Sequence, residues 1–118
     1  MRQPNAALVV DADPARAVKA VAMLVARGYD PVTVVSNYND AVVHARIEQL
    51  DFALLAAEVG GADLGLLATL LSVRAVPFGF ISAALDGSDI PANWRARPFL
   101  AAPFTDPEFD AVLLYSRY

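Results

Sequence analysis

The segment AALVVDADP, residues 6–14, sets the fold class of this chain. Its five consecutive apolar residues are typical of a strand that is buried on both faces of a sheet. Asp11 ends this strand, and Asp13 followed by Pro14 supplies an N-cap and a proline at the first helical position. A buried strand that runs directly into a helix predicts a parallel sheet, because parallel neighbours need a crossover between them.

The same strand-and-helix unit recurs along the chain. Further strands are expected over 32–35, 52–57, 78–81 and 99–101, and helices over 14–27, 39–49 and 63–74. A last helix begins after Thr105, which forms the capping-box pattern with Glu108. Residues 83–98 contain two prolines and a glycine, and they predict an irregular loop with at most one helical turn near 88–95.

Each predicted helix has an apolar face. In the first helix, Val18, Val21, Ala22 and Val25 recur at i, i+3, i+4 and i+7 and predict that face. The inward residues expected in the later helices are Ala41, Val42, Ala45, Leu64, Leu67, Ala68, Leu71, Phe109, Val112 and Leu113. The pattern predicts one three-layer α/β domain over residues 1–118, with its functional site at the carboxyl ends of the strands.

Composition excludes several classes of site and partner. The chain has 118 residues, no cysteine and one histidine, so disulfides, thiolate zinc sites, cysteine nucleophiles and histidine-cluster metal sites are excluded. The net charge of −4 argues against a nucleic-acid partner. The most apolar stretch, 64–85, is interrupted by Arg74 and Pro77, so no membrane span is expected and the predicted location is cytoplasmic.

Four segments in order resemble the receiver domain of two-component response regulators. They are LVVDADP (8–14), FALLAAEVGG (52–61), PFGFISA (77–83) and PFLAAPFT (98–105). The resemblance covers essentially the whole chain. It implies a flavodoxin-like, doubly wound five-stranded parallel sheet of strand order 2-1-3-4-5, here with a shortened or irregular fourth helix.

Three charged positions of that family are alanine in this sequence. The resemblance places Ala56 where the family has its phosphoacceptor aspartate, and alanine has no oxygen that could attack phosphorus. Asp11 matches the first acid of the pair that helps to hold Mg²⁺, but Ala12 replaces the second. Ala102 stands at the position of the family's lysine. We therefore expect an apolar, neutral pocket with no catalytic residue, no metal and no cofactor.

Two other family positions keep their residue type. Ser82 matches the phosphate-sensing hydroxyl and Phe99 the switch aromatic, according to the resemblance. The chain is thus expected to be a pseudo-receiver: a non-enzymatic, phosphorylation-independent interaction module of bacterial signalling.

The resemblance also indicates interaction surfaces. Receivers commonly meet a histidine kinase or phosphotransfer protein through their first helix, where Arg16 and Lys19 lie in this chain. A homodimer through strand five and the last helix would use Leu114 and Tyr115.

Several alternatives remain open at this point. Glu58 together with Asp11 is a weak candidate for a cation site. A small ligand such as a cyclic dinucleotide could be held by Trp94, Arg95 and Arg97, which would make the chain a ligand sensor. The competing interpretation is that Trp94 covers the edge of the core. His44 is expected to be a surface residue rather than a phosphotransfer histidine.

Overall fold

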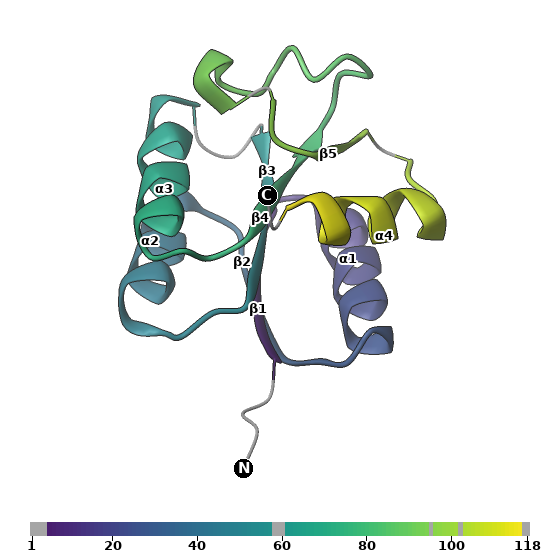
Figure 1. The fold of residues 1–118 in the computed structure, drawn as a ribbon, viewed down its shortest axis with the longest axis horizontal. Coiled ribbons are helices and arrows are strands. Elements are labelled where there is room, and N and C mark those ends of the chain that lie inside the picture. Colours follow the sequence, from purple (N-terminus) through teal and green to yellow (C-terminus); the bar gives the residue numbers. More distant parts are fainter. Residues whose placement is uncertain (1–4, 58–60, 95, 102, 117–118) are drawn as a thin grey trace.

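The protein is a three-layer α/β sandwich in a computed structural model that describes residues 5–57, 61–94, 96–101 and 103–116 (Figure 1). The elements are β1 (Asn5–Val10), α1 (Pro14–Ala26), β2 (Tyr29–Val35), α2 (Tyr38–Ile47), β3 (Phe52–Ala56), α3 (Gly61–Val73), β4 (Phe78–Ser82), the 3-10 turn η2 (Ala92–Trp94), β5 (Phe99–Ala101) and α4 (Asp106–Tyr115).

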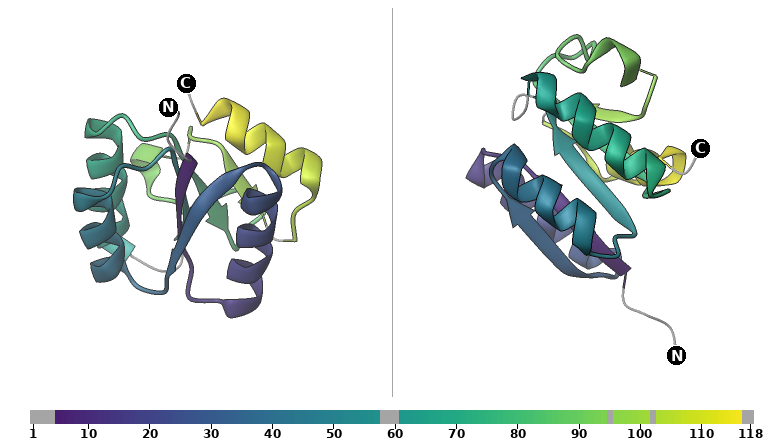
Figure 2. Two further views of the ribbon diagram at one scale, coloured as in Figure 1. Left: turned by 90° about the horizontal axis from the view of Figure 1, so that it is seen from below. Right: turned by 90° about the vertical axis from the view of Figure 1, so that its left-hand side faces the viewer.

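All the strands run parallel in the order β2-β1-β3-β4-β5, which confirms the predicted topology. Helices α2 and α3 cover one face of the sheet, and α1 and α4 cover the other (Figures 1 and 2). Successive residues of β1 therefore enter different cores: Leu8 and Val10 pack under α2 and α3, and Val9 packs under α1 and α4. This alternation explains why β1 is a continuous apolar run.

The sequence signals for helix ends are confirmed. The side chain of Asp13 accepts hydrogen bonds from the amides of Ala15 and Arg16, so it is an N-cap. Thr105 and Glu108 form the reciprocal capping box of α4. Within the described part of the loop between β4 and β5, the helical structure is the single turn η2, as the prolines predicted.

The predicted buried face of α1 is wrong. Its buried residues are Ala17, Ala20, Met23 and Leu24, whereas Val18 is 69% exposed and Val25 56% exposed. Because α1 is apolar on more than one side, periodicity alone does not choose the inward face. Two alanines, a methionine and a leucine thus face the sheet, and Val18 and Val25 lie on the outer side of the helix. For the later helices the predicted inward residues are buried or packed against the cores.

No helix in the described ranges combines the length and the apolar character that crossing a bilayer requires.

Candidate functional site

The carboxyl ends of the central strands bring the predicted site residues to one edge of the sheet. Val10 is in register with Leu55, and Ala56 is in register with Ile81, so Asp11, Ala56 and Ser82 follow one another across β1, β3 and β4. The sequence prediction of a shared edge is therefore supported by the register. Ala12 lies exposed beside this edge, and Ala102 and Glu58 lie outside the described residues.

Asp11 is held by an arginine of its own chain. Its side chain is fully buried, and the Arg16 side chain is 12% exposed. The guanidinium donates from Nε to Asp11 Oδ2 at 2.6 Å and from its terminal nitrogen to Asp11 Oδ1 at 2.8 Å. Oδ1 also accepts from the amide of Asp13 at 2.9 Å. The expectation of an apolar pocket is wrong at Asp11, where α1 supplies a guanidinium to the remaining carboxylate, although the resulting ion pair carries no net charge.

This pairing changes what the site can do chemically. Both Asp11 oxygens already accept charge-assisted hydrogen bonds, and a metal ion placed there would face the positive guanidinium. Ala56 is fully buried and packs in the core beneath α1 and α4, so it adds a methyl group and no oxygen. The described residues contain no group of three or more histidine, aspartate and glutamate side chains that could hold a metal ion. The Asp11–Glu58 cation site stays a hypothesis.

Ser82 is buried at the end of β4 and is engaged by the loop that follows. Its hydroxyl contacts both the Asp89 carboxylate and the carbonyl of Ala84, and it accepts from the Ala84 amide at 3.0 Å. The other Asp89 oxygen accepts from the amide of Ala83 at 2.8 Å. Sequence reasoning missed Asp89, which lies seven residues beyond Ser82 in a segment that predicts only an irregular loop.

Phe99, at the predicted switch position, is half-buried and lies against Gly87. Gly87 has φ +72°, and a Cβ built there would lie 3.0 Å from two atoms of the Phe99 ring. Because Gly87 has no side chain, the loop after β4 leaves space for the Phe99 ring.

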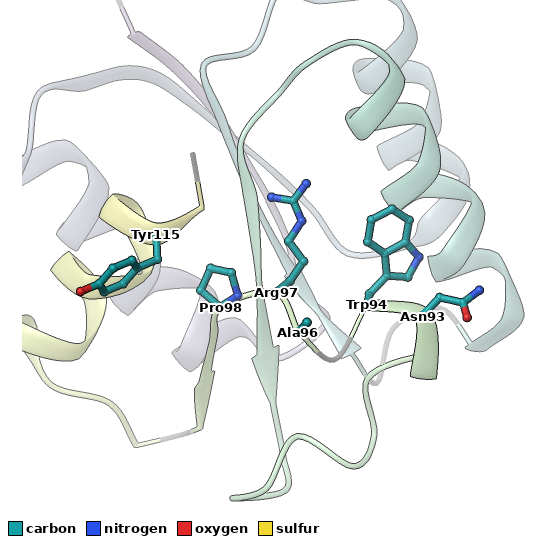
Figure 3. A pocket seen from close by; sticks show the side chains of 6 residues that line it. All are labelled: Asn93, Trp94, Ala96, Arg97, Pro98 and Tyr115. Carbon is teal, nitrogen blue, oxygen red and sulfur yellow. The ribbon is translucent and has the colours of Figure 1, made fainter. Parts of the chain in front are cut away.

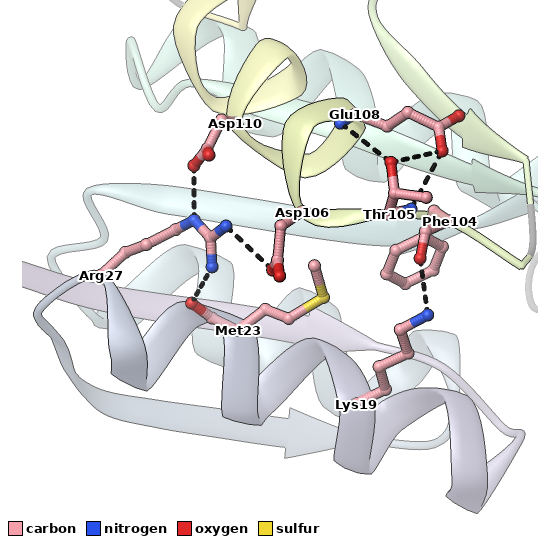
Figure 4. Close-up of polar contacts among 8 residues, drawn as sticks. All are labelled: Lys19, Met23, Arg27, Phe104, Thr105, Asp106, Glu108 and Asp110. Atoms are coloured by element: carbon pink, nitrogen blue, oxygen red, sulfur yellow. Dashed lines mark hydrogen bonds and ion pairs between the residues drawn. The ribbon is translucent and has the colours of Figure 1, made fainter.

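Lys19 on α1 and Arg27 at the C-terminal end of this helix are bound within the protein (Figure 4). Lys19 Nζ donates to the carbonyl of Phe104 at 2.6 Å and lies 4.5 Å from the centre of that ring. Arg27 pairs with Asp110 at 2.6 Å and with Asp106 at 3.2 Å, which ties α1 to α4. The hydrogen bond to Asp110 raises the pKa of Arg27, and the same bond lowers the pKa of Asp110.

The structure therefore does not present Arg16 and Lys19 as an unengaged basic surface. Both side chains hold α1 to neighbouring segments, at Asp11 and at Phe104. Sequence patterning placed these cations on α1 correctly, but it gave no sign that their partners lie at the strand end and in the turn after β5. The exposed side chains that remain on α1 include the valines of its outer face.

A groove of about 620 Å³ lies beside β5, between η2 and the end of α4 (Figure 3). Its walls include Trp94, Arg97, Pro98 and Tyr115. The Trp94 ring packs edge-on against Phe78 at 5.5 Å, which confirms that Trp94 covers the core edge.

Arg97 is also committed to the fold. Its guanidinium lies 4.2 Å from the centre of the Phe78 ring and donates to the carbonyl of Ser116 at 3.0 Å. Burial lowers the pKa of Arg97. Arg95, the third member of the predicted ligand-binding set, lies outside the described residues.

Three further predicted residues, on α2 and α4, have simple surroundings. Leu114 and Tyr115 on α4 are more than half exposed, as an interaction surface requires. His44 pairs with Glu48 one turn later on the outside of α2, in agreement with a surface role.

Comparison with known proteins places this geometry among solved receiver domains. No protein-family model and no curated protein matches the chain. SdrG from Sphingomonas melonis matches with a TM-score of 0.82 at 25% identity, over 100% of both chains. The receiver domain of a sensor histidine kinase from Pseudomonas aeruginosa, solved with magnesium coordinated in its active site cleft, matches with a TM-score of 0.78 at 24% identity, over 98% of this chain and 100% of that one.

A response regulator from Burkholderia pseudomallei also shares the fold. Its crystal structure contains a phosphorylated aspartic acid, a calcium ion and citrate. It matches with a TM-score of 0.74 at 22% identity, over 92% of this chain and 66% of that one.

Proposed function

We propose that this chain, which shares its fold with solved receiver domains of two-component signalling, is a pseudo-receiver that signals without phosphorylation. One observation carries the proposal: Ala56 stands at the end of β3, beside an Asp11 that Arg16 already neutralises. Phosphoryl transfer to a protein needs a nucleophilic oxygen and cations that balance the phosphoryl charge. Here the residue at the end of β3 offers no nucleophilic oxygen, and Asp11, the buried acid of the described residues, is paired with Arg16.

The pair also offers a physical reason for independence from metal. Burial of an unpaired carboxylate costs desolvation free energy, and a bound metal ion can offset that cost. In this protein Arg16 does so permanently, since it belongs to the helix that follows β1. The domain then needs neither Mg²⁺ nor a phosphoryl group to hold the carboxyl ends of β1 and β3 in place.

We further propose that the domain acts by binding another signalling protein, such as a histidine kinase or a phosphotransfer protein. Because Arg16 and Lys19 are bound within the chain, recognition through α1 would depend on the exposed valines rather than on charge. Leu114 and Tyr115 provide a second exposed surface, which is available for pairing with another copy.

The cyclic-dinucleotide alternative receives less support. Such a ligand would need aromatic and guanidinium groups that are available to stack and to bind phosphate. Trp94 and Arg97 instead pack on Phe78, and Arg97 also binds the carbonyl of Ser116.

Phosphorylation by a small-molecule donor tests the proposal directly. The protein is incubated with acetyl phosphate and millimolar Mg²⁺, and its intact mass is measured. We expect no added phosphoryl group. SdrG, for which a BeF₃-activated conformation has been solved, serves as the parallel control for donor and buffer. A mass increase of one phosphoryl group that hydroxylamine removes would show that another carboxylate accepts phosphate, and would overturn the proposal.

A further inference from the structure

Two hydrogen-bond donors at the end of β4 bind a carboxylate of the same chain, that of Asp89. The Ser82 hydroxyl and the Ala83 amide both contact the Asp89 carboxylate, one through each oxygen. Ser82 is fully buried, whereas Asp89 belongs to the exposed surface of the loop. A hydroxyl and a backbone amide that converge on one carboxylate form charge-assisted bonds, which are stronger than neutral ones.

We propose that Asp89 is an internal latch that fixes the loop after β4 and, through it, the position of Phe99. The latch deepens the proposed function and rests on it: in a site that receives no phosphoryl group, the Asp89 carboxylate is the anion that engages Ser82. Asp89 is a positioning residue: it acts through the backbone and the Ser82 hydroxyl.

The loop provides a short physical connection from the latch to Phe99. The amide of Ile90 donates to the carbonyl of Gly87 at 3.0 Å, and the amide of Gly87 donates to the carbonyl of Ala84 at 3.1 Å. Two successive turns therefore connect Asp89 to the glycine on which the Phe99 ring lies. Side chains packed this closely do not shift independently, so release of Asp89 should loosen the contact between Gly87 and Phe99.

The same segment continues into one wall of the groove beside β5. Ile90 is buried in the core under α2 and α3, and η2 begins two residues later with Trp94 at its end. Trp94 is the single tryptophan of the chain, so its fluorescence reports on this segment alone.

Amide hydrogen exchange in Asp89→Ala tests the latch. We expect exchange at Ala83 to accelerate by about tenfold or more, since that amide loses its acceptor and the loop loses its anchor. The NMR signals of the Phe99 ring should shift, and the emission of Trp94 should move to longer wavelength as its packing on Phe78 loosens. Asp89→Asn, which keeps one acceptor oxygen, should give a smaller acceleration.

Asp51→Asn is the matched control. The Asp51 carboxylate accepts from the amide of Ala6 at 2.8 Å, the same distance as between Asp89 and Ala83, but at the amino ends of the strands. This variant should accelerate exchange at Ala6 and leave Ala83, Phe99 and Trp94 unchanged.

The outcome also separates the latch from the proposed function. Unchanged exchange at Ala83 in Asp89→Ala, or the same loop changes in Asp51→Asn, would overturn the latch, whatever the phosphorylation assay gives. A wild-type protein that takes up a phosphoryl group would overturn the proposed function, while the exchange experiment would still measure whether Asp89 holds the loop.

Discussion

Removal of the Arg16 side chain should destabilise the protein strongly. Arg16→Ala removes the guanidinium from the buried Asp11 carboxylate, to which the amide of Asp13 still donates. Loss of one partner of a buried ion pair costs about 3–5 kcal/mol. Arg16 is slightly exposed and water can enter once it is gone, so we expect the lower end, about 3 kcal/mol. For a domain of this size that corresponds to a fall in Tm of about 12 °C.

Urea unfolding followed by Trp94 fluorescence measures this cost. Arg46→Ala, which removes an exposed arginine from α2, is the control and should change stability by less than about 0.5 kcal/mol. In the double variant Asp11→Asn/Arg16→Met, the buried charge is absent and an acceptor for Asp13 remains. This variant should recover most of the lost stability, because a buried pair can often be replaced by neutral groups. An Arg16→Ala protein that unfolds with the wild-type midpoint would refute a buried, energetically coupled pair.

Further predictions concern the α1–α4 contact and two glycines. The hydrogen bond from Arg27 lowers the pKa of Asp110 in the folded protein below its ordinary value of 3.8. The stability that this contact contributes is therefore present above pH 3.8 and is lost as the pH falls through the lowered pKa of the folded state. Thermal melts of wild type and Asp110→Asn should therefore differ at neutral pH and converge in acid; a constant difference would contradict this. Gly87→Ala should cost at least about 1–2 kcal/mol, since φ is positive and the new Cβ meets Phe99. Gly65→Ala, within α3 and with open space around it, should instead gain about 0.5–1 kcal/mol, and equal losses in both would be inconsistent with these surroundings.

The sequence alone determined the elements and their order. Apolar runs, N-caps and loop prolines are local signals, and they were sufficient for the parallel sheet, the capping box at Thr105 and the single helical turn in the described part of the loop between β4 and β5. The absence of a side-chain oxygen at position 56 likewise follows from the sequence, because alanine has none however it packs. These features depend on residue type and on spacing within a few residues, so they can be predicted without knowledge of tertiary contacts.

Only the tertiary structure decided which side of α1 is buried and where its cations go. Val18 and Ala17 are both apolar, and only the packing of the helix on the sheet decides that Ala17 is buried and Val18 exposed. Arg16 lies five residues from Asp11, yet its rotamer follows from the carboxylate that the buried end of β1 presents to it. Asp89 likewise reaches Ser82 through a loop whose path no periodicity encodes. Long polar side chains can reach many partners, and the partner is fixed only when the fold places a buried, opposite charge or an unsatisfied donor within range.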